Sequence, residues 1–181
     1  MTSATTAVIS LGANLGDRLG HLQSAVDGLR AHRVSGVYET APWGDPDQPA
    51  YLNAVVIAEA AGRAPRDWLT LAHALEAAAE RQRDPGRRYG PRTLDVDLLD
   101  IRNADGHSCA SDDPELTLPH PRAAVRAFVL VPWKELEPDA TVPGAGTVTE
   151  LLAVPETAKD LAGVRRRDDL ELRPWQTAPD E

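Results

Sequence analysis

The spacing of apolar residues along this 181-residue chain alternates between strand-like and helix-like segments. The order of these segments restricts the possible folds more than any other feature. Short apolar runs typical of strands occupy residues 7–11, 34–41, 51–60 and 93–101. A segment whose apolar residues have helical spacing lies between the first and second runs, and another lies between the third and fourth. The predicted order is strand, helix, strand, strand, helix, strand. That order is typical of the ferredoxin-like α+β fold, an antiparallel sheet that carries its helices on one face.

Both predicted helices have recognisable starts. Asp17 precedes the first helix and Pro65 opens the second, and these residue types favour the N-cap and the first helical turn. Their apolar faces comprise Leu19, Leu22, Val26 and Leu29 in the first helix and Trp68, Ala72, Leu75 and Ala79 in the second.

Extra helical segments are expected toward the C-terminus. A helix disturbed at Pro132 is predicted within residues 119–139, and Thr147 and Glu150 have the spacing of a capping box at the start of another. Chain length predicts a single domain over residues 1–164. The tail, residues 165–181, has too few apolar residues to fold alone and is expected to be flexible.

The charge balance restricts the possible partners. The chain has 19 basic and 28 acidic residues, a formal charge of -9, which disfavours nonspecific binding to nucleic acid or to an anionic membrane. No apolar run approaches the roughly 20 residues of a membrane span, the N-terminus does not resemble a signal peptide, and Cys109 is the lone cysteine. A cytoplasmic monomer with small-molecule partners is expected.

Two aspartates stand two residues apart in the last predicted strand. Alternate side chains of a strand share a face, so Asp95 and Asp97 point the same way, with Cα atoms about 6.6–7 Å apart. Two carboxylates can close around one or two divalent cations over that span, and oxygen ligands favour Mg²⁺ or Mn²⁺. For an isolated pair, a solvated strand face is the simpler interpretation. Leu99 weakens that interpretation because it continues the same face with an apolar residue.

Arginines precede the acidic pair in an otherwise acidic protein. The planar guanidinium suits phosphate oxygens, although such arginines often only pair with nearby acids. Beside the two aspartates, they predict a polyphosphate held between arginines and metal-binding carboxylates. The chain lacks the G-x-x-x-x-G-K-[ST] loop and the H-R-D signature of protein kinases. The arginines are Arg81, Arg83, Arg87, Arg88 and Arg92, with Asp84 as the acidic residue among them.

Four sequence blocks resemble, in order, the hallmark blocks of the 6-hydroxymethyl-7,8-dihydropterin pyrophosphokinase family of folate biosynthesis. They are "SLGANLGDR", "YETAPWG" with "QPAYLNAVV", "GPRTLDVDLL" and "LPHPRAAVRAFVLVPW", and they span about residues 8–135. The resemblance implies a ferredoxin-like fold. It also implies a reaction that moves the β,γ-pyrophosphoryl unit of ATP to the pterin hydroxymethyl oxygen and releases AMP.

The resemblance also implies roles for individual residues. Asp95 and Asp97 are expected to hold two Mg²⁺ ions, and Arg81 and Arg92 to complete the catalytic set. Gln82 belongs to a loop that the family closes over ATP. The expected ATP contacts are Glu76, Arg83, Arg88, Tyr89, Arg92, Leu98, Thr117, His120 and Arg126. The expected pterin contacts are Thr40, Pro42, Trp43, Tyr51, Asn53, Asp95 and Phe128. Without the resemblance, Glu76 would be taken for an exposed helix residue, and Tyr51 and Phe128 for core residues.

Three positions depart from the family pattern. Ala13 replaces a serine, Glu80 replaces a glycine before the loop arginine, and Tyr89 replaces a tryptophan. These departures concern the loop and the packing of adenine. The metal strand and the pterin residues keep the pattern.

Two other functions fit part of the sequence. The same order of elements occurs in RNA-recognition domains, but the strands at 7–11 and 93–101 lack aromatic residues for base stacking. A metal-dependent nucleotidyltransferase or phosphatase could use the same carboxylates, and its reaction products would distinguish it.

Overall fold

The computed structural model describes residues 4–42, 46–80 and 92–176, and all structural statements below refer to these residues. The first part of the chain contains β1 (Ala4–Ala13), α1 (Arg18–Leu29), β2 (Arg33–Val34), β3 (Tyr38–Thr40), β4 (Tyr51–Ala61), α2 (Pro65–Ala78) and β5 (Asp95–Arg102). The second part contains β6 (Ser111–Asp113), β7 (Leu116–Leu118), the 3₁₀ turn η1 (Ala123–Val125), α3 (Ala127–Leu136), β8 (Thr141–Val142), β9 (Gly146–Thr147), α4 (Val148–Ala153), α5 (Pro155–Leu161) and β10 (Val164–Arg166). The predicted order of elements is confirmed through β5, except that the second strand is split into β2 and β3.

The main sheet is antiparallel throughout, which confirms the predicted α+β class. Its strand order is β10-β3-β4-β1-β5, and β2 also pairs with β4. The central strand β1 sets the register of the region where the predicted site residues lie. Gly12 of β1 is opposite Asn53 on one side and Asp95 on the other, and Ser10 is opposite Asp97.

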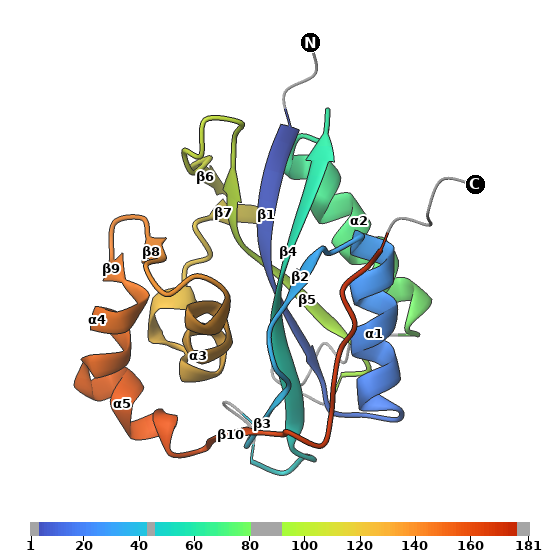
Figure 1. Cartoon of the computed structure of the whole chain (residues 1–181), viewed down its shortest axis with the longest axis vertical. Helices are drawn as coiled ribbons and strands as arrows, with labels where there is room; N and C mark the ends of the chain where they lie inside the picture. The colour runs from blue at the N-terminus through green and yellow to red at the C-terminus, as the bar shows by residue number, and fades with distance from the viewer. Residues whose placement is uncertain (1–3, 43–45, 81–91, 177–181) are drawn as a thin grey trace.

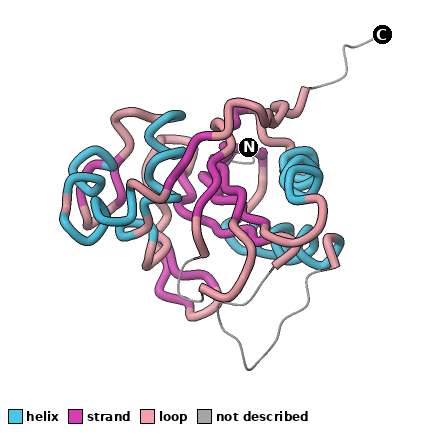
Figure 2. The backbone as a smooth tube through the Cα atoms, turned by 90° about the horizontal axis from the view of Figure 1, so that it is seen from below, coloured by secondary structure: helices cyan, strands magenta, loops and turns pink. Residues whose placement is uncertain are grey.

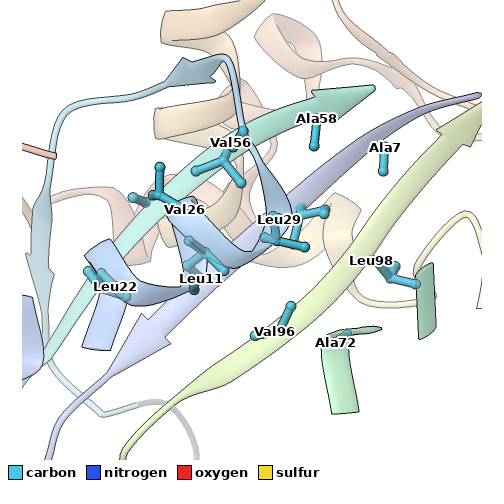
Figure 3. Close-up of a cluster of buried hydrophobic side chains, with 14 of the residues drawn as sticks. Ala7, Leu11, Leu22, Val26, Leu29, Val56, Ala58, Ala72, Val96 and Leu98 are labelled. Carbon is cyan, nitrogen blue, oxygen red and sulfur yellow. The ribbon is translucent and has the colours of Figure 1, made fainter. Parts of the chain in front are cut away.

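Helices cover both faces of this sheet (Figures 1 and 2). The expectation of helices on one face holds for α1 and α2, which enclose the larger apolar core (Figure 3). Its labelled residues include Leu22, Val26 and Leu29 of α1 and Ala72 of α2, facing Leu11, Val56, Val96 and Leu98 of the sheet. The helices after β5 pack on the opposite face, where Trp133 of α3 joins Val8, Val55 and Leu99 in a second core. The apolar Leu99 on the acidic face of β5 is therefore explained by α3.

The ends of the helices follow the sequence signals. The carboxylate of Asp17 accepts a hydrogen bond from the N–H of Gly20 at 3.0 Å, and Pro65 occupies the first turn of α2. Thr147 and Glu150 form the predicted capping box of α4. These predictions are confirmed because capping depends on residues three positions apart, which are in contact in any helix.

The helix expected within residues 119–139 is shorter than predicted. It begins at Ala127, after η1, and it contains Pro132 as expected. Arg126 has an extended backbone with φ of -112° and ψ of 104°, which separates η1 from α3. Pro119 and Pro121 disfavour the helical conformation in the residues that precede them, Leu118 and His120, so the helix does not begin there.

The C-terminal segment differs from the expected flexible tail. β10 pairs with β3, and Leu172 is 3% exposed in the larger core. The N–H of Trp175 donates to the carbonyl of Ala31 at 2.8 Å. Residues 165–176 are thus packed on the rest of the protein. The few apolar residues of this segment, such as Leu172, are buried by contact with the rest of the chain.

In the part of the chain that the structure describes, every helix is too short or too polar to span a bilayer.

Candidate functional site

Asp95 and Asp97 project from the start of β5 into a cluster of cationic side chains. The Nη1 atom of Arg92 donates to Oδ2 of Asp95 at 2.7 Å. Oδ2 of Asp97 lies 3.5 Å from Nη1 of Arg126 and 3.9 Å from Nε2 of His120. Strand alternation places the two carboxylates together, and the residues around η1 supply the groups opposite Asp97.

The electrostatics of Asp97 favour an added cation. Burial, and secondly the negative charge of Asp95, raise the pKa of the Asp97 carboxyl to about 7, although Arg126 and Arg92 act in the opposite direction. Ionising both carboxylates is therefore costly unless another positive charge is present. A divalent cation would supply that charge.

His120 is held in its neutral form. Burial, with the charges of Arg126 and Arg122, lowers the pKa of its imidazole to about 4. Its Nδ1 atom accepts a hydrogen bond from the N–H of Arg122 at 3.2 Å, so the proton of the neutral ring is on Nε2. The side that faces Asp97 is therefore a hydrogen-bond donor.

One side of the acidic pair opens into a pocket that encloses about 550 Å³, including solvent at its mouth. We call it the first pocket. It brings together most of the residues predicted to contact a pterin, which come from β3, β4, β5 and α3. Its lining residues are Ser10, Gly12, Thr40, Ala41, Tyr51, Asn53, Arg92, Asp95, Asp97, Arg126 and Phe128.

Asn53 lies in the wall of the first pocket and is almost fully buried. Its Nδ2 atom donates to Oγ1 of Thr40 at 2.7 Å, a bond that fixes the orientation of the amide. Across the sheet, a Cβ atom on Gly12 would lie 3.1 Å from Oδ1 of Asn53 and 3.6 Å from the Tyr51 ring. A side chain at position 12 would therefore require the Asn53 amide oxygen to move by a few tenths of an ångström, whereas its contact with Tyr51 would be ordinary.

A second pocket, of about 790 Å³, opens on the other side of the acidic pair. It is bounded by α2, β5, β7 and the segment before η1. Its lining residues are Leu69, His73, Glu76, Arg92, Asp95, Val96, Asp97, Leu98, Pro114, Glu115, Leu116, Thr117, His120 and Pro121. Arg92, Asp95 and Asp97 line both pockets, so the carboxylates stand at the boundary between the two.

The predicted ATP contacts divide between these pockets. Glu76, Leu98, Thr117 and His120 line the second pocket, whereas Arg126 lines the first. The guanidinium of Arg126 is 5.6 Å from the centre of the Phe128 ring, beside the carboxylate of Asp97.

Glu76 is not the exposed helix residue that a simple interpretation of its helix suggests. It is 5% exposed, and its Oε1 atom accepts a hydrogen bond from the N–H of Val96 at 3.0 Å. β5 is an edge strand of the main sheet, and α2 packs against it, so the carboxylate takes the place of a neighbouring strand as acceptor.

Asn14 is a site residue to which sequence analysis assigned no role. It is 2% exposed, its Oδ1 accepts from the N–H of Arg92 at 2.7 Å, and its own N–H donates to the Arg92 carbonyl at 3.0 Å. Its Nδ2 donates to Gln48 at 2.9 Å. Its position in the sequence block "SLGANLGDR" could have indicated that Asn14 belongs to the site, because the block also contains Ser10 and Gly12 of the first pocket.

Several predicted site residues lie outside the described residues: Trp43, Arg81, Gln82, Arg83, Arg88 and Tyr89. Pro42 is described but does not line the first pocket, whereas its neighbour Ala41 does.

Known proteins resemble this chain in sequence. The family model described as "7,8-dihydro-6-hydroxymethylpterin-pyrophosphokinase (HPPK)" matches residues 8–138. The 2-amino-4-hydroxy-6-hydroxymethyldihydropteridine pyrophosphokinase of Mycobacterium leprae is 47% identical over 171 residues, covering 89% of this chain and 88% of that protein. The protein of the same name from Mycobacterium tuberculosis H37Rv is 45% identical over 163 residues, covering 85% and 86%.

Solved structures resemble the fold at low sequence identity. A crystal structure of Plasmodium falciparum HPPK-DHPS with pteroate matches with a TM-score of 0.66 at 12% identity, covering 90% of this chain and 44% of that one. A triple mutant of the same protein with pteroate matches with a TM-score of 0.64 at 13% identity, covering 91% and 47%. The chain spans less than half the length of these structural relatives, and at such identities the likeness shows the fold alone.

Proposed function

The chain belongs to the 7,8-dihydro-6-hydroxymethylpterin-pyrophosphokinase family, and from this membership we propose how its two pockets divide the reaction. The family reaction is the ATP-dependent transfer of a pyrophosphoryl group to the hydroxymethyl group of 6-hydroxymethyldihydropterin, in folate biosynthesis. We infer that the first pocket binds the pterin, that the second binds ATP, and that the acidic pair lies where the two substrates meet. The observation that carries this proposal is that Arg92, Asp95 and Asp97 line both pockets.

The first pocket has the chemistry that a pterin requires. A flat heterocycle with donors and acceptors on one edge needs aromatic surfaces and an amide in a fixed orientation. Tyr51 and Phe128 supply the aromatic surfaces, and Asn53, oriented by Thr40, supplies the amide. Pro42 and Trp43 remain proposed contacts because the family pattern includes them. The hydroxymethyl group would then point toward Asp95.

The second pocket has the chemistry that a nucleotide requires. Leu98 supplies apolar surface, and Thr117 and His120 supply polar contacts. The neutral imidazole of His120 can donate one hydrogen bond from Nε2 to a phosphate oxygen without needing a proton from solvent. Arg92 and Arg126 place positive charge beside the acidic pair. We propose that Arg81, Arg83, Arg88 and Tyr89 add contacts from the segment between α2 and Arg92.

Asp95 and Asp97 fit the requirements of Mg²⁺. Their oxygen donors suit a hard cation, and the raised pKa of Asp97 marks a place where added positive charge is favourable. Among the described residues, no cluster of three or more acidic, His or Cys side chains could hold a metal. Mg²⁺ commonly takes one or two carboxylates and completes its shell with phosphates and water. Two bound ions would neutralise the ATP phosphates, so that the hydroxymethyl oxygen can approach phosphorus.

We also propose the finer topology of the sheet. The strand order agrees with a ferredoxin-like topology, in which α1 and α2 are the two helices of the split motif. A single domain, a monomeric state and a cytoplasmic location remain predictions from the sequence.

Product analysis tests the assignment. The purified protein is incubated with Mg²⁺, ATP and 6-hydroxymethyl-7,8-dihydropterin, and nucleotides and pterins are separated by anion exchange. We expect AMP and pterin diphosphate in equal amounts, with loss of both when Mg²⁺ is removed by a chelator. Formation of ADP, release of orthophosphate, or attachment of AMP to the pterin would each overturn the proposal.

A further inference from the structure

The strand β3, which carries Thr40 into the first pocket, has only three residues and lies between β4 and β10. Thr40 is opposite Tyr51 on one side and opposite Val164 on the other. Without β10, this short strand would form the edge of the sheet and have partners on one side only. The position of Thr40, and through it the amide of Asn53, therefore depends on what holds β3 from the C-terminal side.

The segment that holds β3 continues from β10 alongside α1 (Figure 1). We call residues 164–175 the C-terminal strap. Gln23 of α1 makes two hydrogen bonds with the backbone of Arg173, at 2.9 and 3.0 Å. Leu172 is buried in the larger core, and the guanidinium of Arg30 lies 5.3 Å from the centre of the Trp175 ring. The far end of the strap is thus anchored independently of β3.

Glu39, the residue before Thr40 in β3, is where the arginine side chains of the strap contact this strand. Its carboxylate accepts from Nη1 of Arg167 at 2.9 Å and is also hydrogen-bonded to Arg165. Nη1 of Arg18 lies 3.5 Å from the same carboxylate oxygen, Oε2, and donates to the carbonyl of Ala50 at 2.9 Å. Ala50 directly precedes Tyr51, so Glu39 joins the strap to both strands that supply pocket residues.

The exposed fractions of the side chains indicate which arginine contributes more to holding Glu39. The side chain of Arg165 is 70% exposed, whereas those of Arg167 and Glu39 are 24% and 17% exposed. Ion pairs in contact with solvent contribute little, and partly buried ones with short hydrogen bonds contribute more. Arg167 is therefore the principal contact.

We propose that Glu39 and Arg167 are positioning residues for the pterin: their ion pair holds β3 so that Thr40 keeps the Asn53 amide in its binding orientation. This inference rests on the proposed function, because it takes the first pocket as the pterin site. Neither residue lines the second pocket. Their loss should consequently weaken pterin binding and leave ATP binding unchanged.

The test compares Michaelis constants for the two substrates in single variants of the full-length protein. Arg167→Ala and Glu39→Gln should each raise the KM for the pterin about fivefold and keep the KM for ATP within about twofold. Arg167→Lys should recover part of the loss, because the charge remains but the planar fork is gone. The double variant Glu39→Gln/Arg167→Ala should have a pterin KM no higher than that of the more impaired single variant, because both substitutions remove the same interaction.

Arg173→Ala is the matched control. It removes an exposed arginine from the same strap, and the guanidinium of Arg173 makes no hydrogen bond or ion pair with the described residues. Its KM values should equal those of the unmodified protein. If Arg167→Ala does not fold, Glu39→Gln carries the comparison.

Asn53→Ala separates failure of this inference from failure of the proposed function. If Asn53→Ala raises the pterin KM while Arg167→Ala and Glu39→Gln do not, the strap has no positioning role and the pocket assignment stands. If Asn53→Ala leaves the pterin KM unchanged, the pocket assignment and the strap proposal are both overturned. Equal increases in both KM values in Arg167→Ala would indicate general loosening and would also overturn the inference.

Discussion

Gly12 of β1 lies directly opposite Asn53 of β4, and a Cβ atom at position 12 would come within 3.1 Å of the Asn53 amide oxygen, a contact too tight to form unless the amide moves slightly. The same Cβ would be 4.0 Å from Cβ of Asp95. Position 12 thus adjoins both the Asn53 amide, proposed to bind the pterin, and Asp95 of the acidic pair.

We expect Gly12→Ala to act on pterin affinity. The added methyl group would shift the Asn53 amide oxygen by a few tenths of an ångström. The KM for the pterin should therefore rise about tenfold, while the KM for ATP and the far-ultraviolet circular dichroism spectrum stay unchanged. Steady-state kinetics with each substrate varied in turn would measure this. Ala13→Gly, on the neighbouring strand position that faces the core, is a control for strand stability. A normal pterin KM in Gly12→Ala would contradict the dependence of pterin binding on the exact position of the Asn53 amide.

Asp97→Asn should abolish most turnover without unfolding the protein. The amide removes a metal-binding charge, and we expect a loss of roughly a thousandfold or more in kcat. In the presence of a chelator, the melting temperature should be equal or higher, because the variant removes a partly buried charge beside Asp95. Differential scanning fluorimetry would measure stability alongside the activity assay. Retained activity would contradict the metal-binding role.

Glu76→Ala is expected to affect both stability and ATP binding. The change leaves the N–H of Val96 without its carboxylate acceptor in a buried position, at a cost of about 1–3 kcal/mol in the free energy of unfolding. It also changes the wall of the second pocket, so the KM for ATP should rise and that for the pterin should not. Glu76→Gln keeps an acceptor oxygen and should restore most of the stability. Urea denaturation would compare the three proteins, and equal stability of all three would contradict the role of this hydrogen bond.

The ion pair between Arg102 and Glu137 should make stability depend on pH. Burial alone would raise the pKa of the Glu137 carboxyl, but hydrogen bonds from Arg102, both at 2.8 Å, and from Trp133 at 3.0 Å lower it. A carboxyl with a lower pKa in the folded state stabilises the protein above its unfolded pKa of about 4.3, and this contribution is lost as pH falls through the folded value.

Glu137→Gln should therefore lower the free energy of unfolding by about 1–3 kcal/mol at pH 7. The difference from the unmodified protein should shrink steadily below about pH 4. Denaturant unfolding at several pH values would measure it, with Glu171→Gln as an exposed control. A difference that does not change with pH would exclude ionisation of Glu137 as its source.

Local patterns in the sequence were sufficient for much of the fold. The strand period of two put Asp95 and Asp97 on one face, and Asp17 and Thr147 marked the starts of α1 and α4. Such features depend on residues a few positions apart, whose relative placement follows from the geometry of a single helix or strand. The family blocks added the grouping of Thr40 and Asn53 with the acidic pair.

Contacts between distant segments were decided only by the tertiary structure. Glu76 is buried because α2 lies over the edge of β5, and residues 164–175 pack on the rest of the protein because α1 and β3 offer them a surface. The amphipathic pattern of α2 does not reveal which backbone N–H the carboxylate of Glu76, on the buried face of the helix, will meet. The sequence by itself determined which side chains share a face, since that follows from backbone geometry. Tertiary structure decided which faces meet, since burial and hydrogen bonding are properties of the packed chain as a whole.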